Sequence, residues 1–76
     1  MLELVKYIVD QLVEDKNSVN ITESESDGVT TISIRVAESD IGKVIGKQGK
    51  IATSIRTLAK AVGIKEGKRY NIEIED

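Results

Sequence analysis

The sequence of 76 residues contains no cysteine, histidine, proline, tryptophan or phenylalanine, and its only aromatic residues are two tyrosines. Without cysteine and histidine, neither a disulfide framework nor a Cys/His metal site can support the fold. The same absence removes the commonest nucleophiles and general bases of enzymes. The acidic pairs Glu14-Asp15 and Glu75-Asp76 lie at the ends of predicted elements, where solvent-facing charge is the simplest interpretation. We therefore expect no enzymatic activity, no cofactor and no metal.

Long hydrophobic runs are also missing. The N-terminal segment is apolar only on alternate turns and carries Glu3, Lys6 and Asp10, unlike the continuous apolar region of a signal peptide. No run approaches the roughly 18 apolar residues that a membrane span needs. The absence of cysteine is compatible with a reducing compartment. We expect no membrane insertion and a cytoplasmic location.

Acidic and basic residues are divided unevenly along the chain. Residues 1–40 carry three basic side chains against nine acidic ones, a net charge of −6, whereas residues 41–76 carry eight against four, a net charge of +4. Between Ile41 and Arg69 the only acidic residue is Glu66. Such asymmetry indicates a basic face set against an acidic one. On charge alone, the alternative that these lysines only keep a helix soluble stays open.

The spacing of apolar residues predicts six elements. Helical spacing predicts helices at residues 2–15, 41–45 and 50–62. Alternation predicts strands at residues 19–22, 30–36 and 70–75, with Asp27-Gly28 as a hairpin signal between the first two. The order is therefore α-β-β-α-α-β, and the fold class is α+β. We expect one domain over residues 1–76, a two-layer sandwich in which three helices cover a three-stranded sheet.

Two element ends have specific signals. Ser39 or Asp40 can cap the second helix, because their side-chain oxygens accept hydrogen bonds from its first N–H groups. Gly63 is expected to follow the third helix as its C′ residue, with Ile64 folding back against the last turn. The residues from Lys65 to Lys68 are expected to form a tight turn before the final strand.

The segment between the second and third helices is the most informative part of the sequence. Gly46 and Gly49 bracket Lys47 and Gln48, and glycine suits both the positive φ values of a tight turn and a close approach to a ligand backbone. The turn opens directly into a helix, whose N-terminus favours anions. Together these features predict a loop that holds phosphate. Turn geometry alone explains the two glycines equally well. Lys47 and Gln48 are better evidence for phosphate binding, because a turn needs only polar residues at these positions.

The chain resembles the type II KH domains, which share the order α-β-β-α-α-β, and among them the small bacterial single-KH RNA-binding proteins of the KhpA family. The resemblance covers essentially the whole chain and is carried by its length and by the segment VIGKQGKIATSIRTL, residues 44–58. A bare GXXG recurs by chance, whereas this longer run between two helices is much more specific. The resemblance implies that the GXXG loop clamps about four nucleotides of single-stranded RNA.

Carried over to this chain, the resemblance implies an RNA-binding site around the loop. It comprises Gly46, Lys47, Gln48 and Gly49 as the clamp, Lys43 and Lys50 on its rim, Ile45 and then Val44 in an apolar groove for bases, and Arg56 on the adjoining helix. For Lys43, Lys50 and Arg56, a role in solubility alone is an equal alternative.

Two other nucleotide-binding interpretations are rejected. RNA-recognition motifs and OB folds stack bases on sheet-borne aromatic rings, and Tyr7 and Tyr70 are instead interpreted as residues at the edge of the core. The stretch from Gly42 to Lys47 resembles a P-loop only superficially. It has three residues between its glycines where that motif needs four, and Gln48 follows the lysine instead of serine or threonine.

The resemblance also has physiological implications. It implies an RNA chaperone or post-transcriptional regulator linked to cell-wall and cell-shape homeostasis. The alternative is a protein-interaction module with little RNA binding of its own, which forms a homodimer or pairs with a larger KH-containing protein. Pure dimerisation through the apolar rim of the groove would depend on Ile51, Ile55 and their neighbours, whereas RNA binding would depend on Lys47 and Gln48.

Overall fold

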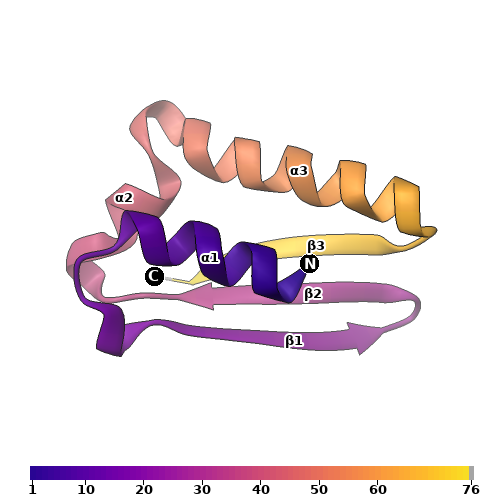
Figure 1. The fold of residues 1–76 in the computed structure, drawn as a ribbon, viewed down its shortest axis with the longest axis horizontal. Coiled ribbons are helices and arrows are strands. Elements are labelled where there is room, and N and C mark those ends of the chain that lie inside the picture. Colours follow the sequence, from indigo (N-terminus) through magenta and orange to yellow (C-terminus); the bar gives the residue numbers. More distant parts are fainter. Residues whose placement is uncertain (76) are drawn as a thin grey trace.

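A computed structural model describes residues 1–75 of the chain as a three-stranded sheet with helices on one side (Figure 1). The order of elements along the chain is α1 (Leu2–Leu12), β1 (Asn20–Ser26), β2 (Val29–Arg35), α2 (Ile41–Ile45), α3 (Lys50–Glu66) and β3 (Arg69–Glu75). Short 3-10 turns occupy Lys16–Ser18, Glu38–Asp40 and Lys47–Gly49. The predicted α+β class and the order α-β-β-α-α-β are confirmed.

The sheet has the order β1-β2-β3, with β1 antiparallel and β3 parallel to β2. A two-residue turn joins β1 to β2, and Asp27 and Gly28 both have positive φ, at 52° and 79°, as the hairpin signal predicts. The parallel β2–β3 pair needs a crossover connection, which α2 and α3 supply. The functional segment lies within this crossover, so the sheet fixes both of its ends.

The core lies between the sheet and the helices. Ile32, Ile34 and Ile72 point from the central and edge strands into one apolar cluster with Val5 and Val9 of α1. Figure 1 shows α1 and α3 running along the strands. The short helix α2 lies at the end of the molecule where the chain passes from β2 to α3. The opposite sheet face carries alternate strand residues that are polar apart from Val29. Neither tyrosine lies on it, which agrees with the absence of an aromatic platform.

Two predicted boundaries are wrong, and so is the position expected for Ile64. The first strand continues to Ser26, because its ladder with β2 extends to the hairpin turn. The third helix continues to Glu66, and Gly67, in the left-handed region at φ 70°, takes the capping role predicted for Gly63. Ile64 does not fold back but is 74% exposed.

Gly63 is a glycine because of packing and not because of a helix end. A Cβ at this position would lie 2.6 Å from the carbonyl oxygen of Lys68, and the Lys68 N–H donates to the Gly63 carbonyl at 2.8 Å. The missing side chain therefore lets α3 approach the start of β3 closely.

Among residues 1–75, no helix is both long and apolar enough to cross a membrane.

Candidate nucleic-acid interface

The turn between α2 and α3 has a geometry that only glycine can adopt at its first position. Gly46 has φ 79° and ψ 170°, a region that is essentially restricted to glycine. A Cβ on Gly46 would lie 2.5 Å from Cγ1 of Ile51, far inside van der Waals contact. Gly49 also has positive φ, at 73°, but a Cβ there would meet nothing within 4 Å. The two glycines thus have different roles: Gly46 is fixed by packing, whereas Gly49 leaves the surface of the loop open.

Gln48 also lies in the left-handed region, at φ 58° and ψ 26°. The Gly49 N–H donates to the Gly46 carbonyl at 3.0 Å and closes the turn. A non-glycine residue in this conformation carries a backbone cost of about 1 kcal/mol. The turn therefore presents Lys47 and Gln48 side by side on an exposed tip.

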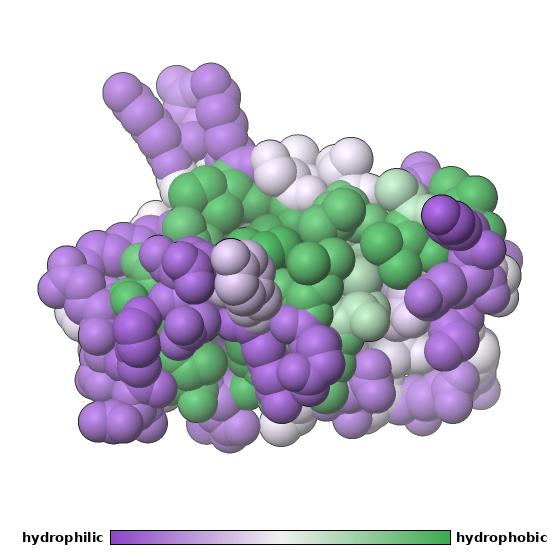
Figure 2. All heavy atoms as spheres, viewed as in Figure 1, coloured by the Kyte–Doolittle hydropathy of each residue, from purple (hydrophilic) through white to green (hydrophobic). Residues whose placement is uncertain are grey.

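The loop opens into the longest helix of the chain. α3 has 17 residues, begins at Lys50 and has no side-chain cap at its N-terminus. The Lys50 N–H donates to the Lys47 carbonyl of the turn, and the N–H groups of the first helical turn carry a partial positive charge. Lys47 and Lys50 are exposed beside them. Figure 2 shows hydrophilic side chains projecting from the end of the molecule where α2 meets α3. This end can bind an anion with both backbone donors and lysine side chains.

Lys43 is not free for such an anion, although the sequence placed it on the same rim. Its Nζ lies 2.6 Å from Oε1 of Glu14 and 3.3 Å from Oδ1 of Asp40. The hydrogen bond to Glu14, followed by that to Asp40, raises the pKa of Lys43 against the opposing effect of desolvation. Two carboxylates therefore neutralise the charge of Lys43. Through them, Lys43 links α2 to the segment that follows α1.

Asp40 is the buried centre of this link, and it is not the helix cap that the sequence predicted. Its side chain makes no capping hydrogen bond to α2 and is only 1% exposed. Its carboxylate accepts hydrogen bonds from the backbone N–H groups of Glu14, at 3.2 Å, and Asp15, at 3.0 Å. The N–H of Asp15 contributes most to lowering the pKa of Asp40, and burial opposes that effect. The carboxylate of Asp40 thus binds the segment after α1 and not the first N–H groups of α2, as the sequence had suggested.

Removing the charge of Asp40 should lower stability in a pH-dependent way. Because the folded-state pKa of Asp40 is lowered from 3.8, its contribution is present above that pH and is lost as the pH falls through the folded-state pKa. We expect Asp40→Asn to lower the urea midpoint at neutral pH and to approach the wild-type midpoint in acid. Urea denaturation at several pH values would measure this, with the exposed Glu25→Gln as a control. A deficit that stayed constant into strong acid would contradict the assignment.

The two apolar residues predicted to floor a groove beside the loop lie in different environments. Val44 is fully buried and belongs to the core cluster, so it presents no surface to a base and its predicted contact is wrong. Ile45 is 36% exposed and directly precedes Gly46. It is the apolar side chain of this pair that a ligand at the loop can reach.

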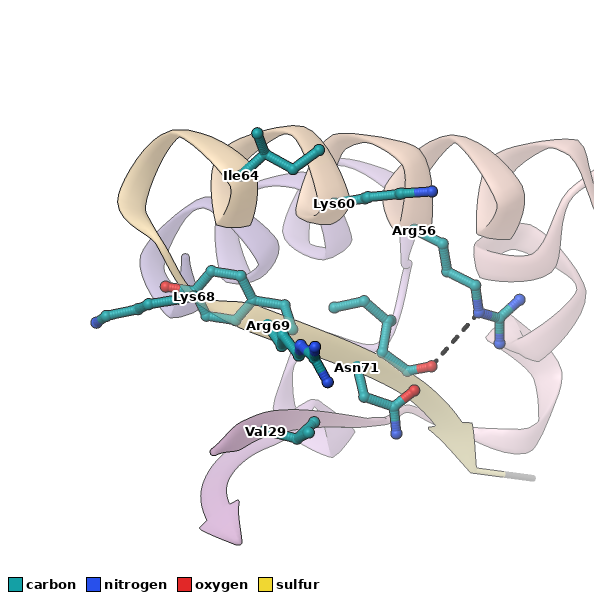
Figure 3. Close-up of a pocket in the computed structure, with 9 residues that line it drawn as sticks. Val29, Arg56, Lys60, Ile64, Lys68, Arg69 and Asn71 are labelled. Atoms are coloured by element: carbon teal, nitrogen blue, oxygen red, sulfur yellow. Dashed lines mark hydrogen bonds between the residues drawn. The ribbon is translucent and has the colours of Figure 1, made fainter. Parts of the chain in front are cut away.

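A groove between α3 and β3 lies farther along α3, and Arg56 is the lining residue of α3 nearest to the loop in the sequence (Figure 3). Its volume is about 600 Å³, and its lining residues are Val29, Arg56, Lys60, Ile64, Lys68, Arg69, Tyr70, Asn71 and Ile72. Arg56, which the sequence placed on the basic track, donates from Nε to the Ile72 carbonyl at 3.4 Å. Since β3 is an edge strand, this contact shows that backbone groups of β3 face the groove.

Sequence reasoning assigned no side chain of the last strand to this groove, and it interpreted Lys68, Arg69 and Asn71 only as parts of a turn and a strand. Tyr70 lies at the edge of the core, as predicted, and packs against the core cluster. The available signal was a pair of basic residues directly before the last strand, combined with an edge position for that strand. That edge position depends on the parallel pairing, which local alternation does not specify.

Comparisons with known proteins agree with the fold. A sequence model of the KhpA/KhpB KH domain matches residues 2–74. Proteins named RNA-binding protein KhpA match over nearly their whole length. The relative from Caldanaerobacter subterraneus is 49% identical over 97% of this chain and 99% of its own, and that from Listeria monocytogenes is 47% identical over 97% of each. The relative from Aquifex aeolicus is 43% identical over 95% of this chain and 91% of its own.

One solved structure shares the fold at lower sequence identity. The crystal structure of Aquifex aeolicus Era superposes with a TM-score of 0.63 at 20% identity. The match covers 96% of this chain but only 28% of the Era chain. It therefore supports the arrangement of helices and strands alone.

Proposed function

This chain belongs to the KhpA/KhpB family of KH domains, and from that premise we propose that it binds single-stranded RNA, with the backbone held on the loop from Gly46 to Gly49. The observation that carries the proposal is the N-terminus of α3, which has no side-chain cap, beside the exposed Lys47 and Gln48. Phosphate oxygens would accept hydrogen bonds from the Lys47 and Gln48 side chains and from the first N–H groups of α3. Residues 1–76 would act as one KH unit in the cytoplasm.

The bases would lie on the groove side of the loop. Ile45 offers an exposed apolar contact, and the edge of β3 offers backbone groups such as the Ile72 carbonyl. Arg56 would exchange its contact with that carbonyl for one with the RNA. Such recognition needs no aromatic platform, in keeping with the polar face of the sheet. Lys50 stays in the proposed site, whereas Lys43 is assigned to the link with Glu14 and Asp40.

Salt dependence is the direct test of a phosphate clamp. If about three phosphates are neutralised, the logarithm of the affinity should fall with the logarithm of the salt concentration at a slope of roughly −2. This corresponds to about a twentyfold loss between roughly 50 and 200 mM salt. Fluorescence anisotropy with a mixed-sequence single-stranded RNA would measure the slope. A slope near zero would exclude the clamp.

The physiological part of the proposal rests on the family resemblance. We propose an RNA chaperone or post-transcriptional regulator whose targets bear on cell-wall and cell-shape homeostasis. The family groups KhpA with KhpB, which supports pairing with a larger KH-containing protein as an additional role.

A second candidate function is that of a protein-interaction module. It is favoured by the apolar surface that Figure 2 shows over the helices and by the exposure of large apolar side chains such as Leu4 and Leu58. Ile55, expected at a dimer interface, is 3% exposed and cannot take part. Homodimerisation or pairing with a KH-containing partner through this surface would survive substitution of the loop, whereas RNA binding would not. Sedimentation analysis of the loop variant, with and without RNA, separates the two roles.

A further inference from the structure

The outer end of the α3–β3 groove lies too far along α3 to belong to the loop. We define the outer groove as Lys60, Ile64, Lys68, Arg69 and Tyr70, all of which line it. Lys60 follows Gly49 by eleven residues, which is roughly 16 Å along a helix. A strand held at the loop must extend along α3 to reach these residues.

The charged side chains that line the groove are all cationic, namely Arg56, Lys60, Lys68 and Arg69. In the part of the chain that the structure describes, residues 1–75, none of them forms an ion pair. Acidic groups lie nearby, since Glu23 and Glu25 share an adjacent hollow with Lys68 and Tyr70. They line that hollow and not this groove, so the groove itself has a positive lining.

The outer groove also offers an aromatic ring whose position is fixed. Tyr70 is half-buried, and its hydroxyl donates to Oε1 of Glu66 at 2.7 Å, a bond that raises the pKa of Tyr70. At Gly63 the helix comes so close that an added Cβ would lie 3.3 Å from Cδ2 of Tyr70. The ring is therefore held between its hydroxyl contact and the backbone of α3. The Ile64 side chain, which also lines the groove, is exposed, whereas the Asn71 amide lies on the side of β3 away from α3 (Figure 3).

This combination of residues fits one kind of occupant. Lysine and arginine around an apolar and aromatic floor suit a nucleotide, whose base stacks on a ring while its phosphate meets the cations. An acidic peptide would satisfy the cations too, but the groove shares Arg56 and Ile72 with the proposed RNA path, which favours the nucleotide.

We propose that the outer groove binds a further nucleotide of the same single-stranded RNA, beyond the nucleotides held at the loop. Its base stacks on Tyr70 beside Ile64, and its flanking phosphates contact Lys60 and Lys68. The inference rests on the proposed function, because the loop supplies the attachment from which the strand extends. It makes the RNA footprint longer than the four nucleotides of a GXXG clamp.

The test compares RNA oligomers of two lengths on two proteins. An oligouridine of four nucleotides, enough for the loop, and one twice as long are titrated into the wild type and into Lys60→Gln/Lys68→Gln, with affinities measured by NMR. The longer oligomer also offers more binding registers, but this statistical gain is the same for both proteins. Lys6→Gln/Lys65→Gln, which removes the same charge outside the groove, is the matched control.

We expect the gain in affinity with length to be about tenfold larger for the wild type and the control than for the Lys60/Lys68 variant. Affinity for the short oligomer should be nearly equal in all three proteins. With the long oligomer only, amide signals from Lys68 to Tyr70 should shift, and abasic flanking residues should reduce the gain.

Each other outcome overturns the inference in a recognisable way. The gain in affinity with length could be equal in all three proteins while the short oligomer still binds. That result would exclude the outer groove as a nucleotide site and leave the loop as the RNA site. It would then favour a peptide as the occupant of the groove. If the wild type binds neither oligomer, the proposed function and the inference fail together.

Discussion

The double substitution Lys47→Asp/Gln48→Asp is expected to lower the affinity for single-stranded RNA by roughly a hundredfold. It removes one cation and one neutral donor and places two carboxylates where the phosphates would lie. Hydrogen bonds to charged groups contribute about 1.5 to 3 kcal/mol each, so the loss of two such contacts alone accounts for this factor. Both side chains are exposed, so the fold should persist. Anisotropy titration measures the affinity, and circular dichroism checks the fold.

The control must carry the same change in net charge elsewhere on the surface. Lys6 and Asn20 are exposed and line a different hollow, between α1 and β1. Lys6→Asp/Asn20→Asp changes the charge by the same amount as the loop variant and should reduce the affinity only slightly. If both variants lost affinity equally, the attraction would come from overall charge and not from the loop. If neither lost any, the RNA would bind elsewhere.

The second large effect is expected from Gly46→Ala, which should destabilise the fold by about 3 kcal/mol. The alanine would be strained at φ 79° and ψ 170°, and its Cβ would lie 2.5 Å from the Ile51 side chain. The clash can be relieved only if Ile51 moves, and this movement would disturb packing because Ile51 lies against the core cluster. Chemical denaturation would show this loss as a lower midpoint with an unchanged slope.

Gly49→Ala provides a matched comparison within the same loop. Its φ of 73° is also positive, yet an added Cβ would meet nothing within 4 Å. We therefore expect a cost of about 1 kcal/mol from backbone conformation alone. Equal costs at Gly46 and Gly49 would show that the contact with Ile51 relaxes freely. A larger cost at Gly49 would contradict the geometry of the turn.

Those parts of the fold that depend on local pattern could be predicted from the sequence. The alternation of Ile32 and Ile34 identified the central strand, and Asp27-Gly28 identified the hairpin. The glycines of GKQG marked the turn between two helices, and both have the positive φ that the sequence suggested. In each case the signal lies within a few residues of the feature, so no long-range contact was needed.

Features fixed by distant partners could not be predicted in this way. Asp40 resembles a helix cap in sequence, but its hydrogen-bond partners are the N–H groups of Glu14 and Asp15, 26 and 25 residues away. Gly63 resembles a helix end, but the carbonyl of Lys68 requires a glycine there. Val44 is apolar in a short helix, and only the packing of α2 on the core determines that it faces inward. The outer groove exists because β3 lies at the sheet edge.

The parallel pairing of β2 with β3 also sets an order in which the molecule can assemble. The β1–β2 hairpin has a two-residue turn and can form early. In contrast, Ser33 and Glu73 meet across 40 residues of chain, and contacts of such long sequence separation form slowly. During synthesis, β3 is the last described element to leave the ribosome. A nascent chain therefore carries the GKQG loop before it has the second wall of the groove, and it acquires the complete surface that we propose for RNA only when β3 docks.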